Sequence, residues 1–169
     1  MTGGIEIILK AAAIGVGGTA ILDVWAFLLQ RFFDIPATNW AMVGRWIGNM
    51  PSGQFVQKSM AAAASVRGEN AIGWSAHYVI GLAYGLLLVG LWGADWVKQP
   101  TLLPPMILAV VLLVAPYFIM MPGMGIGVAG SKTPKPNVTR LKSVLGHSIF
   151  GLGMYVAALL IAAAPSLAA

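Results

Sequence analysis

Hydrophobic positions in this chain are gathered into four long runs, and the polar positions are concentrated between them. Each run has about 20 or more residues, the length of α-helix that crosses the hydrocarbon core of a bilayer. The pattern therefore predicts an all-α, polytopic membrane protein: a four-transmembrane-helix bundle formed by a single integral membrane domain over residues 1–169. The four predicted spans cover about residues 11–33, 71–92, 101–121 and 141–164.

The connection between the first two runs, residues 34–70, is the longest in the chain. Pro36 ends the first helix, because the residue before a proline is pushed out of the α region. Residues 39–47 place two tryptophans and an arginine among apolar residues, which predicts a short helix lying in the membrane interface. Residues 55–66, with four consecutive alanines, predict a second short helix, and residues 3–10 predict an interfacial extension of the first span.

The third run contains three prolines. Pro104 and Pro105 lie near its start, where a helix tolerates them, but Pro116 lies in its interior. There a proline removes one backbone hydrogen bond and its ring clashes with the preceding turn. We therefore predict a kink at Pro116.

Composition supports a membrane protein. Hydrophobic residues make up 59 % of the chain and charged residues 9 %, with a mean hydropathy of +0.84, whereas soluble domains are about 25 % charged. The lack of cysteine excludes disulfides, thiolate metal sites and thiol catalysis. The first run reaches Asp23 without a signal-peptide cleavage site, so we expect it to remain in the mature protein.

The net charge of +5 is distributed unevenly. Lys10 and Lys98 lie on one side of the predicted topology, and eight basic residues lie on the other. The positive-inside rule predicts that loops 34–70 and 122–140 are cytoplasmic and that both termini are periplasmic. Because the basic residues flank apolar runs, they require no nucleic-acid partner. Membrane lipids are the expected partners of five of them, through headgroup contacts by Arg45, Lys132, Lys135, Arg140 and Lys142.

Asp23 interrupts the first run near its middle. An aspartate at that depth costs about 2.5–3.5 kcal/mol, so such residues usually face the bundle interior and mark a proton, ion or ligand site. Thr19, Asp23 and Gln30 fall on one helical face, about 40° wide. The alternative is an aspartate that is protonated or hydrogen-bonded and only holds helices together.

The only two histidines, His77 and His147, share the pattern small-x-x-small-His-x-x-x-Gly-Leu. Each lies about six residues, or about 9 Å, from the predicted cytoplasmic end of its span. The small residues four positions away indicate close helix contacts. The sequence therefore predicts an intramembrane polar cluster of Asp23, His77, His147, Thr19 and Gln30.

Several chemistries fit this cluster. His77, His147 and Asp23 could bind a divalent metal, or the two histidines could be the axial ligands of a b-type haem. Asp23 and a histidine could form a proton relay, or both histidines could be structural. The sequence favours neither metal nor haem as a cofactor.

A glycine-rich segment at residues 125–133 has some likeness to a phosphate-binding loop. That motif requires lysine directly after its second glycine, whereas Ser131 separates Gly130 from Lys132 here. The segment also follows a membrane helix rather than a strand, so no nucleotide is expected. No nucleophile or carboxylate pair has a catalytic spacing. The sequence assigns no catalytic residue and, while leaving enzymatic activity open, favours a non-enzymatic protein.

A set of short motifs covers nearly the whole chain, from about Gly15 to Tyr155. With them, the chain resembles an uncharacterised family of small bacterial four-helix inner-membrane proteins, defined as a domain of unknown function. The resemblance implies a multi-pass protein of the bacterial inner membrane and supplies no activity. The motifs are Asp23-x-Trp25, Asn39-Trp40, Val43-Gly44-Arg45-Trp46, Gly73-Trp74-x-x-His77-Tyr78, Pro122-Gly123-x-Gly125, Ser131-Lys132-Thr133-Pro134 and Arg140-Leu141.

Two functional hypotheses follow. The first is a non-enzymatic accessory or structural subunit of a larger membrane assembly, with membrane-protein partners or self-association. Its buried Asp/His/His cluster would bind an ion or cofactor. The alternative is a small proton-coupled transporter or metal-binding membrane protein, with Asp23 as the protonatable site.

Overall fold

The computed structural model describes residues 2–164, which form helices and loops without any strand. Four helices are long and apolar enough to cross a membrane. The predicted all-α fold with four candidate spans is therefore confirmed. The spans are Gly3–Phe33, Glu69–Trp92, Leu103–Gly123 and Pro136–Ala163.

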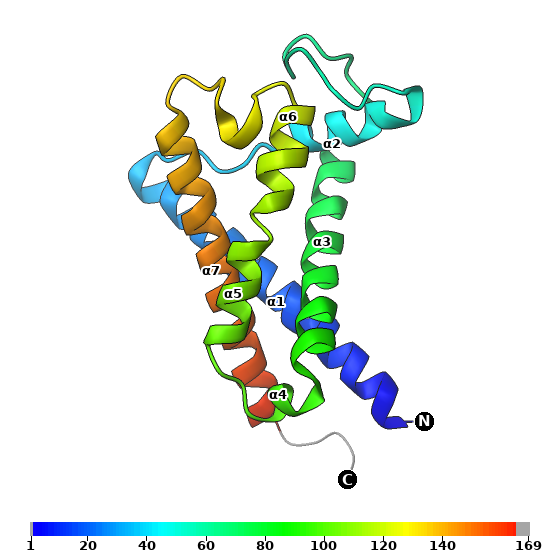
Figure 1. The fold of residues 1–169 in the computed structure, drawn as a ribbon, viewed down its shortest axis with the longest axis vertical. Coiled ribbons are helices and arrows are strands. Elements are labelled where there is room, and N and C mark those ends of the chain that lie inside the picture. The colour runs from blue at the N-terminus through cyan, green and yellow to red at the C-terminus, as the bar shows by residue number, and fades with distance from the viewer. Residues whose placement is uncertain (1, 165–169) are drawn as a thin grey trace.

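The start of α1 and the end of α7 lie together at one end of the bundle, here the terminal end (Figure 1). Helices α2 and α6 and the two long connections lie at the opposite end, here the loop end. Residues 3–10 continue the first helix as predicted. The elements are α1 (Thr2–Phe33), α2 (Trp40–Asn49), η1 (Met50–Ser52), α3 (Glu69–Trp92), α4 (Ala94–Lys98), α5 (Leu103–Val111), η2 (Pro116–Met120), α6 (Met121–Gly123), η3 (Val128–Gly130) and α7 (Pro136–Ala163).

Helix α1 crosses the bundle obliquely and packs against both α3 and α7 (Figure 1). On the α3 side, a Cβ atom on Gly15 would overlap the carbonyl oxygen of Gly81. On the α7 side, a Cβ atom on Gly18 would lie 2.7 Å from the side chain of Met154. Because these positions lack side chains, the helix backbones approach closely and many weak dispersion contacts form.

The third span is interrupted rather than continuous (Figure 1). Helix α5 ends at Val111, and the π-helical turn η2 begins at Pro116. Pro116 has no N–H to donate to Leu112, whose carbonyl instead accepts a bond of 3.1 Å from the backbone of Ala115. The predicted distortion at Pro116 is confirmed.

The connection between α1 and α3 contains one of the two predicted short helices. Helix α2 begins after Asn39, whose side chain accepts a 3.3 Å hydrogen bond from the backbone of Met42. The second helix predicted at residues 55–66 is wrong, because that segment forms turns and irregular loop. In a helix, the carbonyl groups of residues 55–66 would accept from backbone N–H groups. Here two of them accept from side chains of α2 instead: Arg45 donates to Met60 and Asn49 donates to Ala64.

Arg45 holds α2 against the start of α3. Its Nε and Nη2 atoms donate to the two carboxylate oxygens of Glu69 over 2.8 and 2.7 Å. This bidentate bond raises the pKa of Arg45 above its ordinary value, so the guanidinium remains charged. Arg45 was expected to contact lipid headgroups, but the structure directs its donors to Glu69 and Met60 within the protein.

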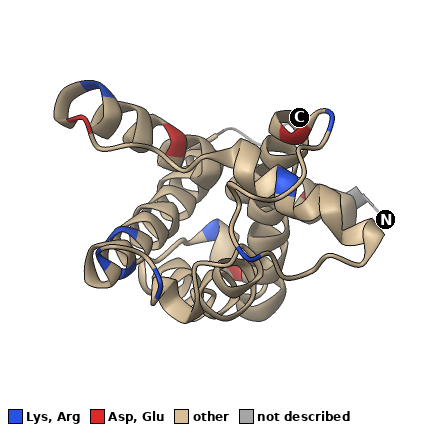
Figure 2. Ribbon diagram, turned by 90° about the horizontal axis from the view of Figure 1, so that it is seen from above, with Lys and Arg blue, Asp and Glu red and all other residues tan. Residues whose placement is uncertain are grey.

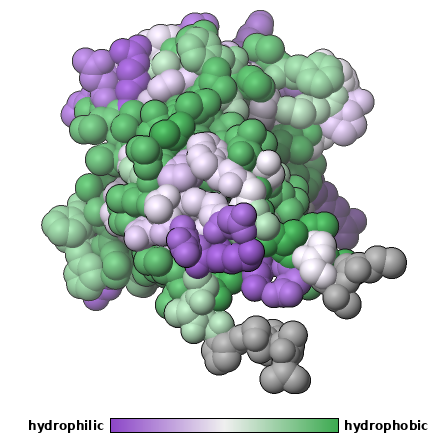
Figure 3. All heavy atoms as spheres, turned by 60° about the horizontal axis from the view of Figure 1, so that its bottom comes forward, coloured by the Kyte–Doolittle hydropathy of each residue, from purple (hydrophilic) through white to green (hydrophobic). Residues whose placement is uncertain are grey.

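The two ends of the bundle differ in charge. At the terminal end, Lys10 pairs with Glu6 and Lys98 pairs with Asp95, over 2.6 and 2.7 Å. The other eight basic residues lie toward the loop end, several of them visible in Figure 2. Hydrophobic residues cover much of the face seen in Figure 3, and hydrophilic residues gather in patches. The structure therefore keeps the uneven distribution of basic residues that the sequence count indicates.

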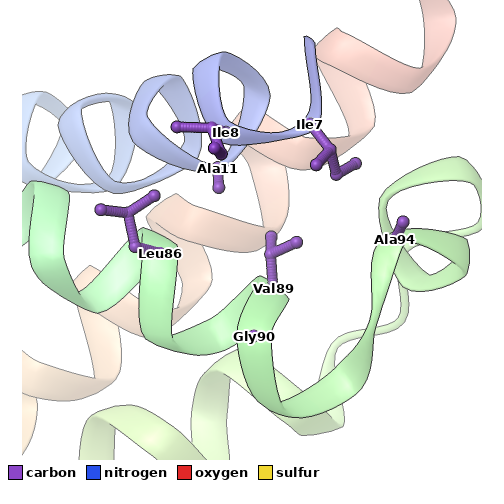
Figure 4. A pocket seen from close by; sticks show the side chains of 7 residues that line it. All are labelled: Ile7, Ile8, Ala11, Leu86, Val89, Gly90 and Ala94. Atoms are coloured by element: carbon purple, nitrogen blue, oxygen red, sulfur yellow. The ribbon is translucent and has the colours of Figure 1, made fainter. Parts of the chain in front are cut away.

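An apolar hollow of about 250 Å³ lies between α1 and α3 at the terminal end (Figure 4). It is lined by apolar residues only, so it offers no group for acid–base or ion chemistry. The lining residues are Ile7, Ile8, Ala11, Leu86, Val89, Gly90 and Ala94.

Candidate functional site

Asp23 and His77, predicted as members of one cluster, are in direct contact. Oδ1 of Asp23 lies 2.9 Å from Nε2 of His77, and Oδ2 accepts a 2.9 Å hydrogen bond from the hydroxyl of Tyr78. The His77 side chain is 8 % exposed and that of Asp23 is 23 % exposed. The site therefore joins α1 to α3 within the membrane-spanning part of both helices.

The register between α1 and α3 places these side chains opposite each other. The helices are antiparallel, with Ala11 against Gly85 and Gly15 against Gly81. Thr19, one turn further along α1, also lies against Gly81. Another turn brings α1 to Asp23 and α3 back to His77, because residues four apart share a helical face. The glycine contacts thus fix the position of the Asp23–His77 pair.

Aromatic rings surround the imidazole of His77. Trp40 of α2 stacks on it with ring centroids 3.9 Å apart and planes 24° apart. Trp74 approaches it edge-on at 5.8 Å and lies 6.4 Å from the ring of Tyr78. Trp40 reaches this position because Gly73 of α3 leaves space for its carbonyl group. Sequence reasoning missed Trp40, Trp74 and Tyr78 as site residues, although all three belong to the motifs quoted above.

The hydrogen bonds leave one nitrogen of His77 available. An ionised Asp23 only accepts, so Nε2 of His77 then carries the hydrogen that bonds to Oδ1. No hydrogen bond to Nδ1 of His77 occurs within residues 2–164, and no fully buried side-chain nitrogen or oxygen in that range lacks a partner. Nδ1 of His77 is therefore not fully buried and makes no hydrogen bond within the described residues.

His147 lies apart from this pair. Its Nδ1 atom is 3.0 Å from the carbonyl oxygen of Ser143 in its own helix. One turn further, Gly151 packs against Pro105 and Ala109 of α5, so this face of α7 is directed toward the third span. In the described part of the chain, no three or more His, Cys, Asp or Glu side chains gather where they could hold a metal ion. The three-residue metal site expected from His77, His147 and Asp23 is thus not assembled.

The two other predicted members of the cluster have different surroundings. Thr19 is fully buried, and its hydroxyl donates to the carbonyl of Gly15 over 2.9 Å. Gln30 is exposed and lines an open hollow of about 400 Å³ at the end of α1, with Phe27, Arg31 and Asp34. Neither side chain bonds to Asp23 in the described residues. Of the five predicted residues, the structure joins Asp23 and His77 and adds Tyr78.

The basic residues before and within α7 differ in their availability. Arg140 donates to the carbonyl of Ala129 and to the side chain of Asn137, each over 3.1 Å. Lys132, Lys135 and Lys142 are exposed. Contact with anionic lipid headgroups stays a prediction, and these three lysines are the residues best placed for it.

One protein family matches most of the chain. Residues 12–161 match the family described as "Protein of unknown function (DUF2938)", a range that includes most or all of each candidate span and every residue of the Asp23–His77–Tyr78 site. Neither the curated proteins nor the solved structures contain a match. The chain therefore belongs to this family of proteins of unknown function.

Proposed function

We propose that this protein is a small proton-coupled carrier of the bacterial inner membrane, with the Asp23–His77 pair as its protonatable site. The observation that supports this function best is the carboxylate–imidazole bond of 2.9 Å inside two membrane-spanning helices. Ionisable groups at that depth are costly and usually serve ion or proton pathways. Asp23 receives or releases the proton, His77 shares it through Nε2, and Nδ1, which has no hydrogen bond in the described residues, is the atom through which the proton leaves the pair.

The interrupted third span supports the same function. Transporters often place their sites beside discontinuous membrane helices, because irregular backbone is tolerated there when protein or a water-filled cavity surrounds it. Here the interruption between Val111 and Pro116 lies in the interior of the span.

A second candidate function is that of an accessory or structural subunit within a larger membrane assembly. It is favoured by the hydrogen bonding of Asp23 within the protein, since each carboxylate oxygen has one donor. A network of this kind holds helices together without changing its protonation. Under this function, the protein would purify with partner subunits, and the neutral Asp23→Asn variant would retain them.

The proposed carrier function is tested with Asp23→Asn in vesicles that contain the purified protein. Asparagine preserves the fold, because its carbonyl accepts from His77 while its amide donates to the hydroxyl of Tyr78. We expect the wild type to dissipate an imposed pH gradient, followed with an entrapped pH-sensitive dye, and the variant to behave as protein-free vesicles. Asp95→Asn is the matched control, because the side chain of Asp95 in α4 is 93 % exposed. Equal proton flux in the wild type and Asp23→Asn would contradict the carrier function.

The proposed orientation places the loop end in the cytoplasm, because eight of the ten basic residues lie there. The chain has no cysteine, so single-cysteine variants report on topology directly. We expect Val56→Cys, at the loop end, to react with a membrane-impermeant maleimide only after the inner membrane is permeabilised. Asp95→Cys, at the terminal end, should react in intact spheroplasts. The reverse labelling would overturn the orientation.

A further inference from the structure

The proposed carrier function leaves the transported solute unnamed, and the surroundings of Asp23 bear on its chemistry. Resting on that function, we propose that the substrate is a lipophilic organic cation that binds the Asp23 carboxylate beside Trp74 and Tyr78. The cation and a proton bind this site in exchange for each other.

The charge of the site suits a monovalent cation. With a neutral imidazole donating from Nε2 of His77, the cluster carries one net negative charge on Asp23. That charge lies between apolar helices, where Coulomb attraction is weakly screened. An anion would be repelled, and a neutral solute would leave the charge uncompensated.

The carboxylate has capacity for a further partner. Each of its oxygens accepts one hydrogen bond within the protein, from His77 or from Tyr78, whereas a carboxylate offers about four lone-pair positions. The Asp23 side chain also remains 23 % exposed. A cationic group can therefore reach it without breaking either bond.

The aromatic rings specify an organic cation. Trp74 is 40 % exposed, and its ring centroid lies 6.4 Å from that of Tyr78, with the planes 30° apart. Cations bind the faces of Trp and Tyr rings within about 6 Å, and the attraction strengthens when water is excluded. Trp40 is already stacked on His77, which leaves Trp74 and Tyr78 as the surface for a ligand.

An inorganic divalent ion fits this site poorly. Such ions require several oxygen or nitrogen ligands in a fixed geometry. Among residues 2–164, no three His, Cys, Asp or Glu side chains are suitably grouped, so Asp23 and His77 lack a third ligand. An alkylammonium or arylphosphonium ion needs only one counter-charge and apolar contacts, which this site provides.

Exchange follows from the single charge. A proton added to the cluster, on Asp23 or on Nδ1 of His77, cancels the negative charge that holds the cation. Binding of the cation opposes protonation for the same reason, since linkage between two ligands is reciprocal. The cation and the proton therefore compete for the same site.

The test measures binding of tetraphenylphosphonium to the purified protein in detergent by equilibrium dialysis. We expect one cation per chain. Once the pH is low enough for the site to protonate, the apparent dissociation constant should rise about tenfold for each further unit that the pH falls, as for linkage to one proton. Asp23→Asn should abolish binding, and Asp95→Asn should leave it unchanged. Trp74→Leu should weaken binding, whereas Trp92→Leu, on the same helix and similarly exposed, should not.

The outcomes separate the substrate class from the carrier function. If the wild type dissipates a pH gradient in an Asp23-dependent manner but does not bind tetraphenylphosphonium, the organic-cation inference fails and the carrier function stands. If Asp23→Asn and Trp74→Leu both bind the cation as tightly as the wild type does, the signal reflects partition into detergent and overturns the inference. Should either variant aggregate, the pH dependence of the wild type decides, because pH-independent binding excludes exchange with a proton.

Discussion

Replacing Gly44 by alanine is expected to separate α2 from α3 and to destabilise the protein more than other changes of this size. A Cβ atom on Gly44 would overlap the carbonyl oxygen of Glu69 and lie 2.6 Å from the backbone nitrogen of Gly73. Both obstacles are backbone atoms, so no side chain can rotate away. Overpacking of this kind costs about 1–3 kcal/mol, and more where the backbone must move.

The displacement should also reach the functional site. Trp40 begins α2, and its ring stacks on His77, so a shift of α2 removes that stacking. The Arg45–Glu69 ion pair would lengthen for the same reason. We expect a lower midpoint of chemical unfolding in mixed micelles, together with a change in tryptophan fluorescence of the folded state.

Gly90→Ala is the matched control for this substitution. Gly90 lies in the last two turns of α3, and a Cβ atom there would meet nothing within 4 Å. Alanine is favoured over glycine by about 0.5–1 kcal/mol inside a helix, so this variant should be as stable as the wild type or slightly more stable. Gly44→Ala with an unchanged unfolding midpoint would show that α2 is not held against α3 as the structure has it.

Removing only one partner of the Asp23–His77 pair is expected to destabilise the fold more than removing both. His77→Leu leaves the Asp23 charge with a single donor, the hydroxyl of Tyr78. A buried charge that loses its partner costs about 3–5 kcal/mol, and the partial exposure of Asp23 reduces this to about 2–4 kcal/mol. In Asp23→Leu/His77→Leu both polar groups are gone, and apolar pairs of similar volume are often as stable as the ion pair.

A double-mutant cycle measures this effect. The four proteins are compared by unfolding in mixed micelles, and the coupling free energy is the departure from additivity. We expect the double variant to be more stable than His77→Leu and to lack the Asp23-dependent proton flux of the wild type. Additive costs would mean that the two side chains do not interact in solution, which would remove the basis for the proposed function.

The sequence by itself determined the membrane character, the four spans and the break at Pro116. These features depend on local properties: apolar runs as long as a bilayer is thick, and a proline that lacks an N–H. Asp23 and His77 could also be selected from the sequence, because polar groups in such runs are costly wherever they lie. The depth of His77 was estimated from the same helical rise that placed His147.

Only the tertiary structure decided which polar residues meet. Residues Asp23 and His77 are 54 positions apart, and their contact depends on the antiparallel register set by Gly15, Gly81 and Gly85. The similar sequence context of His147 indicated a partner site, yet its helix face is directed toward α5. A shared pattern fixes depth along a helix but leaves the rotation of that helix toward its neighbours undetermined.

The dependence on tertiary contacts also explains why the helix predicted at residues 55–66 is wrong. Residues 55–66 have helical propensity, but Arg45 and Asn49 bind carbonyl groups of that segment, and those bonds form only after α2 has packed. Propensity is worth tenths of a kcal/mol per residue and yields to such contacts. Hydrophobic length thus determined which four segments are able to cross a membrane, whereas backbone contacts at a few glycines determined where the charged groups come together.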